Sequence, residues 1–481
     1  MMMDDMRLNA PVADSSAAVT YPPYPEYKES GVEWLRDIPS HWEVKKLKFV
    51  SIVQPSNVDK KTIEGEEEIL LCNYTDVYKN EYINNRLEFM RATATSSEIK
   101  KFAVDTGDVI VTKDSEDPRD IAVPACAAEK VEGLLCGYHL TQIKPLSVYG
   151  RYVFRLFQSR GFNAQFVVAA NGVTRFGLPQ YAISNAFVLL PSTEEQQTIA
   201  AFLDYKTTKI DALIAKKKAL SDKLAEKRTA LISHAVTKGL DPKAPMRDSG
   251  IDWLGEIPAH WEVKRLKYLS TYFKGLAFKS EVFGTHGTPL VKASNIKGFR
   301  IVDISTYIPI DNQTDLFEKV KLILGDIIIS TVGSMPRVTN SAVGQIGSVD
   351  ELFDGSYLNQ NTVCIRANHL IYGDFLKFVF MGNYIRSYLD QMALWIANQA
   401  YLEVNNILSA CVGIPPLDEQ LHIVHYLKQQ LESTDRMICK VNEVIKSLAE
   451  YRAALITNAV TGKIDVRNFS LPEAEENISH E

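Results

Sequence analysis

Hydrophobic residues recur at alternating spacings of three and four in two long stretches of the chain. These stretches, residues 193–236 and 418–460, contain neither proline nor glycine, and prolines stand shortly before both of them. Such a spacing lines up one apolar stripe along a helix, so it predicts two long helices that pack together as a coiled coil. The stripe positions are Leu203, Thr207, Ile210, Ile214, Lys217, Ser221, Leu224, Arg228, Leu231 and Ala235, then Leu427, Leu431, Thr434, Ile438, Val441, Ile445, Leu448, Arg452, Leu455 and Ala459.

The sequence contains an internal repeat. Residues 30–51, SGVEWLRDIPSHWEVKKLKFVS, match residues 249–270, SGIDWLGEIPAHWEVKRLKYLS, at fourteen of twenty-two positions. Residues 224–237, LAEKRTALISHAVT, match residues 448–461, LAEYRAALITNAVT, in the same order. A duplicated unit of this size predicts two similar halves.

The duplication also suggests a role for the helices. Each predicted helix is roughly 65 Å long at about 1.5 Å per residue. If a pseudo-twofold axis relates the halves, the helices run antiparallel and their length sets the distance between two globular domains, as a ruler does. The alternative is that they only form a core for two fused domains.

The segments between the repeated blocks differ almost completely. Residues 52–190 and 271–414 share short β-type runs bounded by Gly, Pro and Asn. Two of these runs still align, GDVIVTKDSEDPR (residues 107–119) and GDIIISTVGSMPR (residues 325–337), and each predicts a buried strand followed by a polar loop ending in Pro-Arg. A constant frame around a variable insert is typical of a recognition module, although two paralogous domains that drift apart would look similar.

Composition narrows the class of protein. The 481 residues are 46% hydrophobic and 23% charged, which is typical of a soluble chain with two or three cores, and no apolar run is long enough to span a membrane. The acidic N-terminus is unlike a signal peptide, and six widely spaced cysteines without a CxxC pair argue against disulfides and zinc, so we expect a cytoplasmic protein. The net charge of −6 leaves DNA binding open, because local basic faces remain possible.

The chain lacks the common catalytic motifs. An adenine methyltransferase needs [NDS]PP[YF], but YPPY (residues 21–24) has Tyr in the acceptor position and IPPL (residues 414–417) opens a helix. There is no GxGxxG, GxxxxGK[ST] or HExxH, so nothing indicates a bound dinucleotide, a nucleoside triphosphate or catalytic zinc. We therefore expect a non-catalytic chain with no metal site.

Several single residues have structural interpretations that outweigh functional ones. His422 and His425 are expected on a helix surface, because no further ligand stands at a diagnostic spacing. His41 and His260 precede Trp at the same place in the two repeats, and we expect them to pack or hydrogen-bond in a repeated corner. The lysine run at residues 216–218 is more typical of a solvated helix face than of a phosphate contact.

The repeated blocks resemble a known family. The tandem GVEWLRDIPSHWEVKKLK and GIDWLGEIPAHWEVKRLK, with LLPSTEEQQTIAAFLD and IPPLDEQLHIVHYLK opening the two long helices, are similar to the specificity subunit of type I restriction-modification systems. The resemblance covers nearly the whole chain. It implies an α+β fold of two pseudo-symmetric target-recognition domains, separated by two long helices that pair as an antiparallel coiled coil.

The resemblance also implies partners. The family binds a bipartite asymmetric DNA site, one half per variable domain, and its helices and leaders dock two modification subunits that methylate adenine. Restriction subunits with translocase and nuclease activity join them in host defence. S-adenosylmethionine, ATP and Mg would then belong to the partner subunits, and this chain would bind no cofactor.

These expectations divide the chain into six parts. They are a disordered N-terminal tail (1–26), a first target-recognition domain with its leader (27–190), a first long helix and linker (191–245), a second target-recognition domain with its leader (246–414), a second long helix (415–466) and an acidic C-terminal tail (467–481).

Base-reading residues do not transfer from the family, because its domains are variable. We expect them among polar side chains of the aligned loops, where Asn and Gln can pair with adenine and Arg with guanine. The candidates are Lys113, Asp114, Ser115, Arg119, Tyr138, His139, Thr174 and Arg175 in the first domain, and Thr331, Ser334, Arg337, Gln360, Asn361, Asn398, Gln399 and Tyr401 in the second.

Repeated apolar residues are the candidates for the subunit interface. They are Trp34, Trp42, Leu203, Ile210, Leu224, Leu231, Trp253, Trp261, Leu427, Ile438, Ile445, Leu448 and Leu455. Two other functions stay open: an enzyme with its own recognition domains and an unrecognised catalytic site, and a coiled-coil scaffold that bridges partner proteins without DNA.

Overall fold

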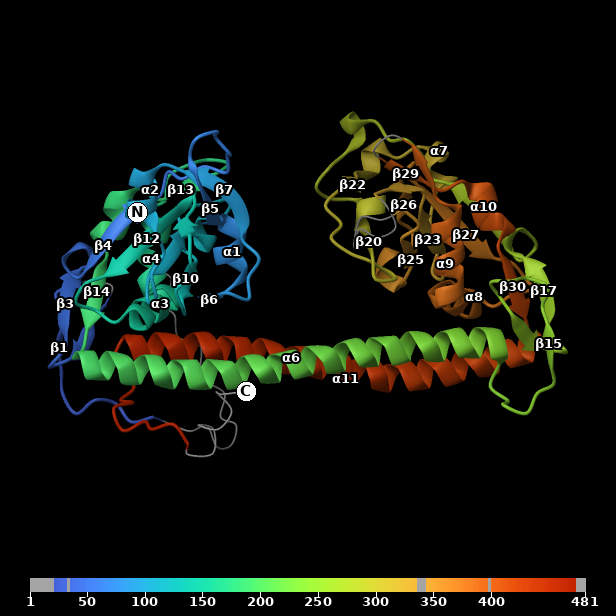
Figure 1. Cartoon of the computed structure of the whole chain (residues 1–481). Coiled ribbons are helices and arrows are strands. Elements are labelled where there is room, and N and C mark those ends of the chain that lie inside the picture. Colours follow the sequence, from blue (N-terminus) through green and yellow to red (C-terminus); the bar gives the residue numbers. More distant parts are fainter. Residues whose placement is uncertain (1–20, 33–34, 335–342, 397–398, 473–481) are drawn as a thin grey trace. The chain divides into compact units, whose positions relative to one another are not determined.

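The computed structural model describes residues 21–32, 35–334, 343–396 and 399–472, and the chain divides into two compact units (Figure 1). Unit 1 comprises residues 1–216 and 444–481, and unit 2 comprises residues 217–443. Each unit contains one mixed domain and parts of both long helices, α6 (Thr193–Lys238) and α11 (Leu417–Val460). The α+β fold with two long helices is confirmed, and the helices begin and end within two residues of the predicted positions.

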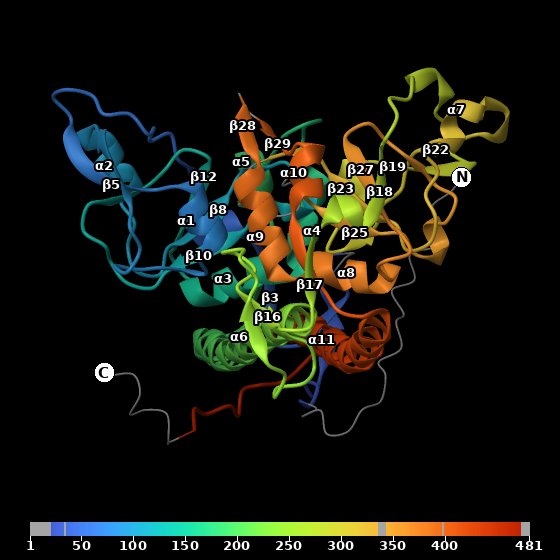
Figure 2. The ribbon, with the colours of Figure 1, turned by 90° about the vertical axis from the view of Figure 1, so that its right-hand side faces the viewer.

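The long helices pair antiparallel in both units. In unit 1, Arg452 of α11 donates to Asp211 of α6 at 2.9 Å, and in unit 2, Arg228 of α6 donates to Asp435 of α11 at 2.7 Å. Residue numbers thus rise along one helix as they fall along the other, and Figure 2 shows the two helices side by side. Every predicted stripe position is buried or half-buried, so the seam is confirmed.

The domain of unit 1 is built on two sheets. The first has the strand order β4 (Ser51–Pro55), β12 (Leu140–Pro145), β8 (Val109–Thr112), β10 (Pro124–Ala127) and β6 (Tyr82–Ile83), and the second has the order β11 (Leu134–Cys136), β5 (Glu67–Cys72) and β7 (Met90–Ala94). The helices are α1 (Tyr74–Lys79), α2 (Ser96–Phe102), α3 (Gly150–Gln158), α4 (Arg160–Ala169) and α5 (Gln180–Ser184). All four residues of β8 are buried, as the apolar run at its position predicts.

The domain of unit 2 repeats this plan. One sheet has the order β18 (Ser270–Lys274), β27 (Thr362–Ala367), β23 (Ile327–Ser330) and β25 (Ile346–Ser348), and another has the order β22 (Tyr307–Ile308), β19 (Thr288–Val291) and β26 (Tyr357–Leu358). The helices are α7 (Asp315–Glu318), α8 (Gly373–Met381), α9 (Asn383–Met392) and α10 (Val404–Ser409). The buried β23 occupies the place of β8, which confirms the second predicted strand.

The repeated leaders form the same small sheets in each unit. The strands are β1 (Tyr27–Glu29) with β2 (Asp37–Pro39) and β3 (Glu43–Lys46) with β14 (Phe187–Leu190) in unit 1, and β15 (Met246–Asp248) with β16 (Glu256–Pro258) and β17 (Glu262–Arg265) with β30 (Cys411–Ile414) in unit 2. The pairing of β3 with β14, and of β17 with β30, brings the start of each domain next to its end.

A buried corner holds each leader against a long helix. In unit 1 the indole of Trp42 donates to Glu195 at 3.1 Å, and Nε2 of His41 lies 2.9 Å from the other oxygen of that carboxylate. In unit 2, Trp261 and His260 make the same contacts with Glu419, at 3.2 and 2.7 Å. The hydrogen-bonding role expected for the two histidines is confirmed.

The predicted tails need a correction where they meet the core. Tyr24 is buried and donates to Glu195 at 2.6 Å, so the predicted disordered tail is wrong for residues 21–26. Phe469, placed by the sequence in the C-terminal tail, packs edge-on against Phe202. A single aromatic residue among prolines and polar residues gives little signal in the sequence, but in the fold Tyr24 bonds to α6 through its hydroxyl and Phe469 packs its ring on α6.

Candidate nucleic-acid interface

The polar loop after the central strand lies at the same place in both domains. In unit 1 the amide of Lys113 donates to the carbonyl of His139 at 3.1 Å, and in unit 2 the amide of Thr331 donates to the carbonyl of Asn361 at 2.9 Å. A two-residue strand then follows in each loop and pairs with a later segment of the domain. The pairs are β9 (Asp114–Ser115) with β13 (Phe176–Gly177) and β24 (Val332–Gly333) with β29 (Gln399–Tyr401).

In unit 1 this frame gathers charged side chains around one carboxylate. Oδ1 of Asp114 accepts a hydrogen bond from Arg175 at 2.9 Å, and Oδ2 lies 2.5 Å from Nδ1 of His139. The ring of Tyr138 packs edge-on against the imidazole of His139. The hydrogen bond that Arg175 donates to Asp114, followed by the negative charge of Asp114, raises the pKa of Arg175, so the guanidinium remains charged.

Lys113 stands beside this cluster. Its ammonium donates to the carbonyl of Ser56 at 3.2 Å and lies 4.5 Å from the centre of the Tyr138 ring. Burial lowers the pKa of Lys113, and the negative charge of Asp114 offsets only part of this decrease. The ammonium is therefore partly desolvated, which strengthens its attraction for an anion that approaches it.

A hollow of about 320 Å³ opens next to the cluster, lined by Tyr74, Tyr78, Asp114, Ser115, Glu116, Asp120 and Arg175. The rings of Tyr74 and Tyr78 stack with an interplanar angle of 16°. Burial, followed by the charges of Asp120 and Asp114, raises the pKa of Tyr74, so its hydroxyl stays protonated as a hydrogen-bond donor. These tyrosines are not among the candidates from the sequence, because their spacing of four on a short helix is the one signal that groups them.

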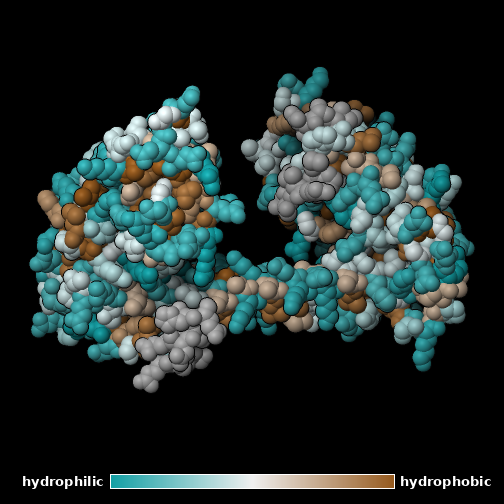
Figure 3. All heavy atoms as spheres, viewed as in Figure 1, coloured by the Kyte–Doolittle hydropathy of each residue, from teal (hydrophilic) through white to brown (hydrophobic). Residues whose placement is uncertain are grey.

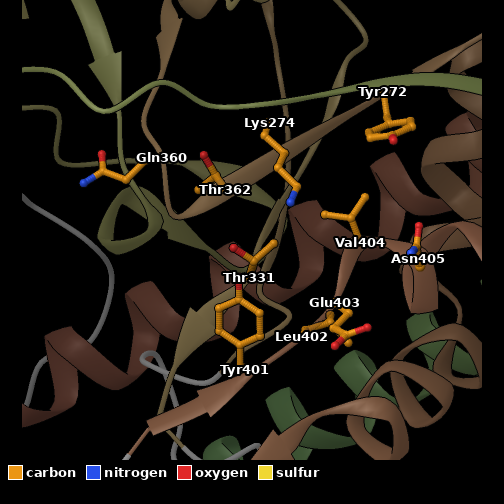
Figure 4. A pocket seen from close by; sticks show the side chains of 10 residues that line it. All are labelled: Tyr272, Lys274, Thr331, Gln360, Thr362, Tyr401, Leu402, Glu403, Val404 and Asn405. Carbon is orange, nitrogen blue, oxygen red and sulfur yellow. The ribbon is translucent and has the colours of Figure 1, made fainter.

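The matching place in unit 2 is a pocket of about 300 Å³ (Figure 4). Three candidates, Thr331, Gln360 and Tyr401, line it. The other lining residues are Tyr272, Lys274, Thr362, Leu402, Glu403, Val404 and Asn405. Polar side chains from four separate segments of the sequence thus meet around one hollow.

Lys274 supplies in unit 2 the cation that Lys113 supplies in unit 1. Lys274 pairs with Val363 in its sheet, and Pro55 pairs with Thr141 at the same register position of the first sheet. Pro55 precedes Ser56, whose carbonyl accepts the hydrogen bond from the Lys113 ammonium. Each frame therefore contains one lysine in this region, Lys113 from the loop after the central strand and Lys274 from the end of the neighbouring strand, so the aligned loops do not reveal Lys274.

Comparisons with known proteins agree with the repeat and the fold. The chain is 22% identical over 457 residues to the MjaVIII type I restriction enzyme specificity subunit of Methanocaldococcus jannaschii, spanning 92% of this chain and 98% of that protein. It is 22% identical over 312 residues to the EcoBI type I restriction enzyme specificity subunit of Escherichia coli, spanning 63% and 64% of the two chains. The chain is therefore similar, over nearly its whole length, to type I restriction enzyme specificity subunits.

A solved structure shares the fold of this chain. A chain from a type I restriction-modification system, studied for its complex assembly and conformational transition, superposes with a TM-score of 0.65 at 15% identity over 89% of this chain and 99% of that one. No family model matches the chain.

Other candidate residues of this chain lie outside the two clusters. Arg119 is exposed and pairs with Asp117 at 2.8 Å. Thr174 is exposed on a loop, and Gln399 is exposed on β29. Ser334 accepts a backbone hydrogen bond from Val343. The remaining two candidates, Arg337 and Asn398, lie outside the described residues.

Many of the residues expected at a subunit interface pack inside the chain itself. Trp42, Leu203, Ile210 and Leu455 belong to the core of unit 1, and Trp261 and Leu427 belong to the core of unit 2. We assign these six to the packing of this chain, because a partner could reach them only by opening a core. The half-buried members are Leu224, Leu231, Trp253, Ile438, Ile445 and Leu448, and Trp34 lies outside the described residues.

The outer surface of the described residues is largely hydrophilic on the face that Figure 3 shows. No helix in the described ranges is long and apolar enough to cross a membrane. The same ranges contain no group of three or more His, Cys, Asp or Glu side chains placed to hold a metal ion.

Proposed function

We propose that this chain is the DNA-reading subunit of a type I restriction-modification complex, and that each domain binds one half of a bipartite, asymmetric site. The duplicated loop cluster carries the proposal. Two equivalent frames contain one lysine each, but the other polar candidates gathered in the frame are Asp, His and Arg in unit 1 and Thr, Gln and Tyr in unit 2. A lysine suits a phosphate in any sequence, whereas the differing polar side chains suit different base edges.

The proposed partners follow from the family. Two modification subunits would dock on the long helices and leaders, and would supply S-adenosylmethionine and the adenine methylation. Restriction subunits would supply ATP- and Mg-dependent translocation and cleavage. This chain would contribute no catalytic residue and bind no cofactor.

A gel shift with random duplex DNA distinguishes this proposal from a scaffold that bridges proteins without DNA. We expect a shift with the chain alone or with a modification subunit added, and a decrease of that shift with rising salt, because phosphate contacts release counterions. A scaffold would shift DNA under neither condition.

Exchange of residues 52–190 for the same region of another family member should change one half of the recognised site only. The second domain and both helices are untouched, so the other half-site and the spacer should persist. Sequencing of methylated adenines in cells that express the complete system measures the result. A change in both half-sites would contradict one reader per domain.

Lengthening both helices by four residues should lengthen the spacer by one or two base pairs. Four residues advance a helix by about 6 Å and complete nearly one turn, whereas DNA rises about 3.4 Å per base pair. Ser221 of α6 contacts Asn442 of α11 at 3.2 Å, so insertions after these two residues keep the flanking ion pairs in register. The methylated motif is the readout, and an unchanged spacer in an active complex would refute the ruler.

A two-residue insertion at the same two places serves as the control. It rotates each apolar stripe by about 200°, so the seam cannot close and the complex should not assemble.

A further inference from the structure

Asp114 connects two of the candidate residues in unit 1. Its side chain is 14% exposed, whereas that of Arg175 is 60% exposed. One carboxylate oxygen accepts from Nη2 of Arg175 at 2.9 Å, and the other lies 2.5 Å from Nδ1 of His139. The carboxylate is thus engaged on both oxygens below the surface, and the guanidinium that it holds faces solvent.

The backbone around Arg175 is also fixed. Asn171 and Gly177 exchange two backbone hydrogen bonds, at 3.0 and 2.8 Å, which close a tight loop around Arg175. Gly172 in this loop has φ +150°, and a Cβ at that position would lie 2.0 Å from the carbonyl oxygen of Arg175. The loop therefore requires glycine there and offers Arg175 little freedom of main-chain movement.

His139 is held from the other side. It has φ +70°, in the left-handed region that is unfavourable for residues other than glycine. The hydrogen bond from the Lys113 amide to the His139 carbonyl and the contact of the His139 ring with Asp114 maintain this conformation. Backbone strain of this kind persists where surrounding contacts hold the residue in place, and it is common at functional sites.

We propose that Arg175 reads a guanine in the half-site bound by unit 1, and that Asp114 is the positioning residue that orients its guanidinium for this contact. The inference rests on the proposed function. A guanidinium has five donors, and within the described residues Arg175 uses Nη2 toward Asp114, so the other nitrogens can reach O6 and N7 of guanine. Orientation before binding lowers the entropy lost when the contact forms.

The described residues of unit 2 differ at the positions equivalent to Asp114 and Arg175. In the paired strands Gly177 lies opposite Asp114 as Tyr401 lies opposite Val332, so Val332 replaces the carboxylate. Arg175 lies two residues before Gly177, and Gln399 lies two residues before Tyr401, so Gln399 is the equivalent of Arg175. An amide without a carboxylate behind it suits adenine better than guanine, so among the described residues of these two loops the arrangement that favours guanine belongs to unit 1.

The test uses the chain in complex with its modification subunits. Methylome sequencing gives the wild-type motif, and the exchange of residues 52–190 assigns the half-site of unit 1. Binding is then measured on duplexes in which single base pairs of that half-site are changed. Arg175→Gln should reduce affinity for the cognate duplex by about 5- to 150-fold and abolish discrimination at one guanine.

Asp114→Asn keeps the shape of the side chain and removes its charge. We expect a smaller loss of discrimination at the same guanine, an unchanged second half-site and an unchanged salt dependence of binding. Asp105→Asn is the control variant. This carboxylate lies in the same domain but pairs with Lys144, at 3.3 Å, and has no contact with the Asp114 cluster among the interactions of the described residues. It should leave the motif as it is.

Two results would overturn the inference while the proposed function stands. One is a bipartite wild-type motif without guanine in the half-site of unit 1. The other is an Arg175→Gln variant that binds all duplexes equally more weakly, with a salt slope lower by about one, since that describes a phosphate contact. A wild-type complex that methylates no bipartite motif would overturn the proposed function itself.

Discussion

Asp204→Lys is expected to destabilise unit 1 by about 3–5 kcal/mol, because it leaves a buried arginine beside a like charge. Arg155 of α3 is 1% exposed, and it donates to Asp204 of α6 from Nε at 3.1 Å and from Nη2 at 2.7 Å. Arg151 and Tyr82 contact the same carboxylate, at 3.2 and 2.9 Å. This carboxylate therefore connects the domain of unit 1 to the long helix.

Unit 2 offers a matched control with inverted charges. Lys428 occupies the place of Asp204 in the repeat and pairs with Asp374 of α8 at 2.6 Å. Both of these side chains are largely exposed, so Lys428→Asp should cost less than about 1 kcal/mol. Urea unfolding of the full chain measures the loss, and hydrogen exchange in α3 and α8 locates it. Equal losses in the two variants would show that Arg155 does not depend on Asp204.

Gly462→Ala is expected to cost about 2–4 kcal/mol, from left-handed backbone strain and from overpacking. Gly462 follows α11 with φ +70°, and a Cβ there would lie 2.4 Å from Cδ of Pro39. Gly239 ends α6 in the same conformation, φ +74°, but the nearest atoms to its Cβ, in Glu419 and Trp261, lie at 3.4 Å. Gly239→Ala should therefore cost only the strain, about 1–2 kcal/mol.

Thermal and urea unfolding of the two glycine variants provide the comparison. Because the backbone conformation is the same at both sites, any difference between them measures the clash with Pro39. If Gly239→Ala proved the more harmful variant, the packing of Pro39 against the end of α11 would not limit that site.

The sequence alone determined the frame of this protein. A seam of alternating three- and four-residue spacing fixed the two helices, because a helix must bury its apolar stripe regardless of what surrounds it. The repeat fixed the corners, in which His41 and His260 hydrogen-bond to equivalent glutamates. The aligned apolar runs fixed the central strands, since a continuous hydrophobic run can only be buried.

Only the tertiary structure decided which polar residues act together. Asp114, His139 and Arg175 are far apart in sequence and meet because β9 pairs with β13 and the Lys113 amide bonds to His139. Lys274 takes the place of Lys113 from another strand, which no alignment of loops can show. Backbone pairing across long separations, unlike helical periodicity, leaves no local mark in the sequence, so the composition of each site is set by the fold as a whole.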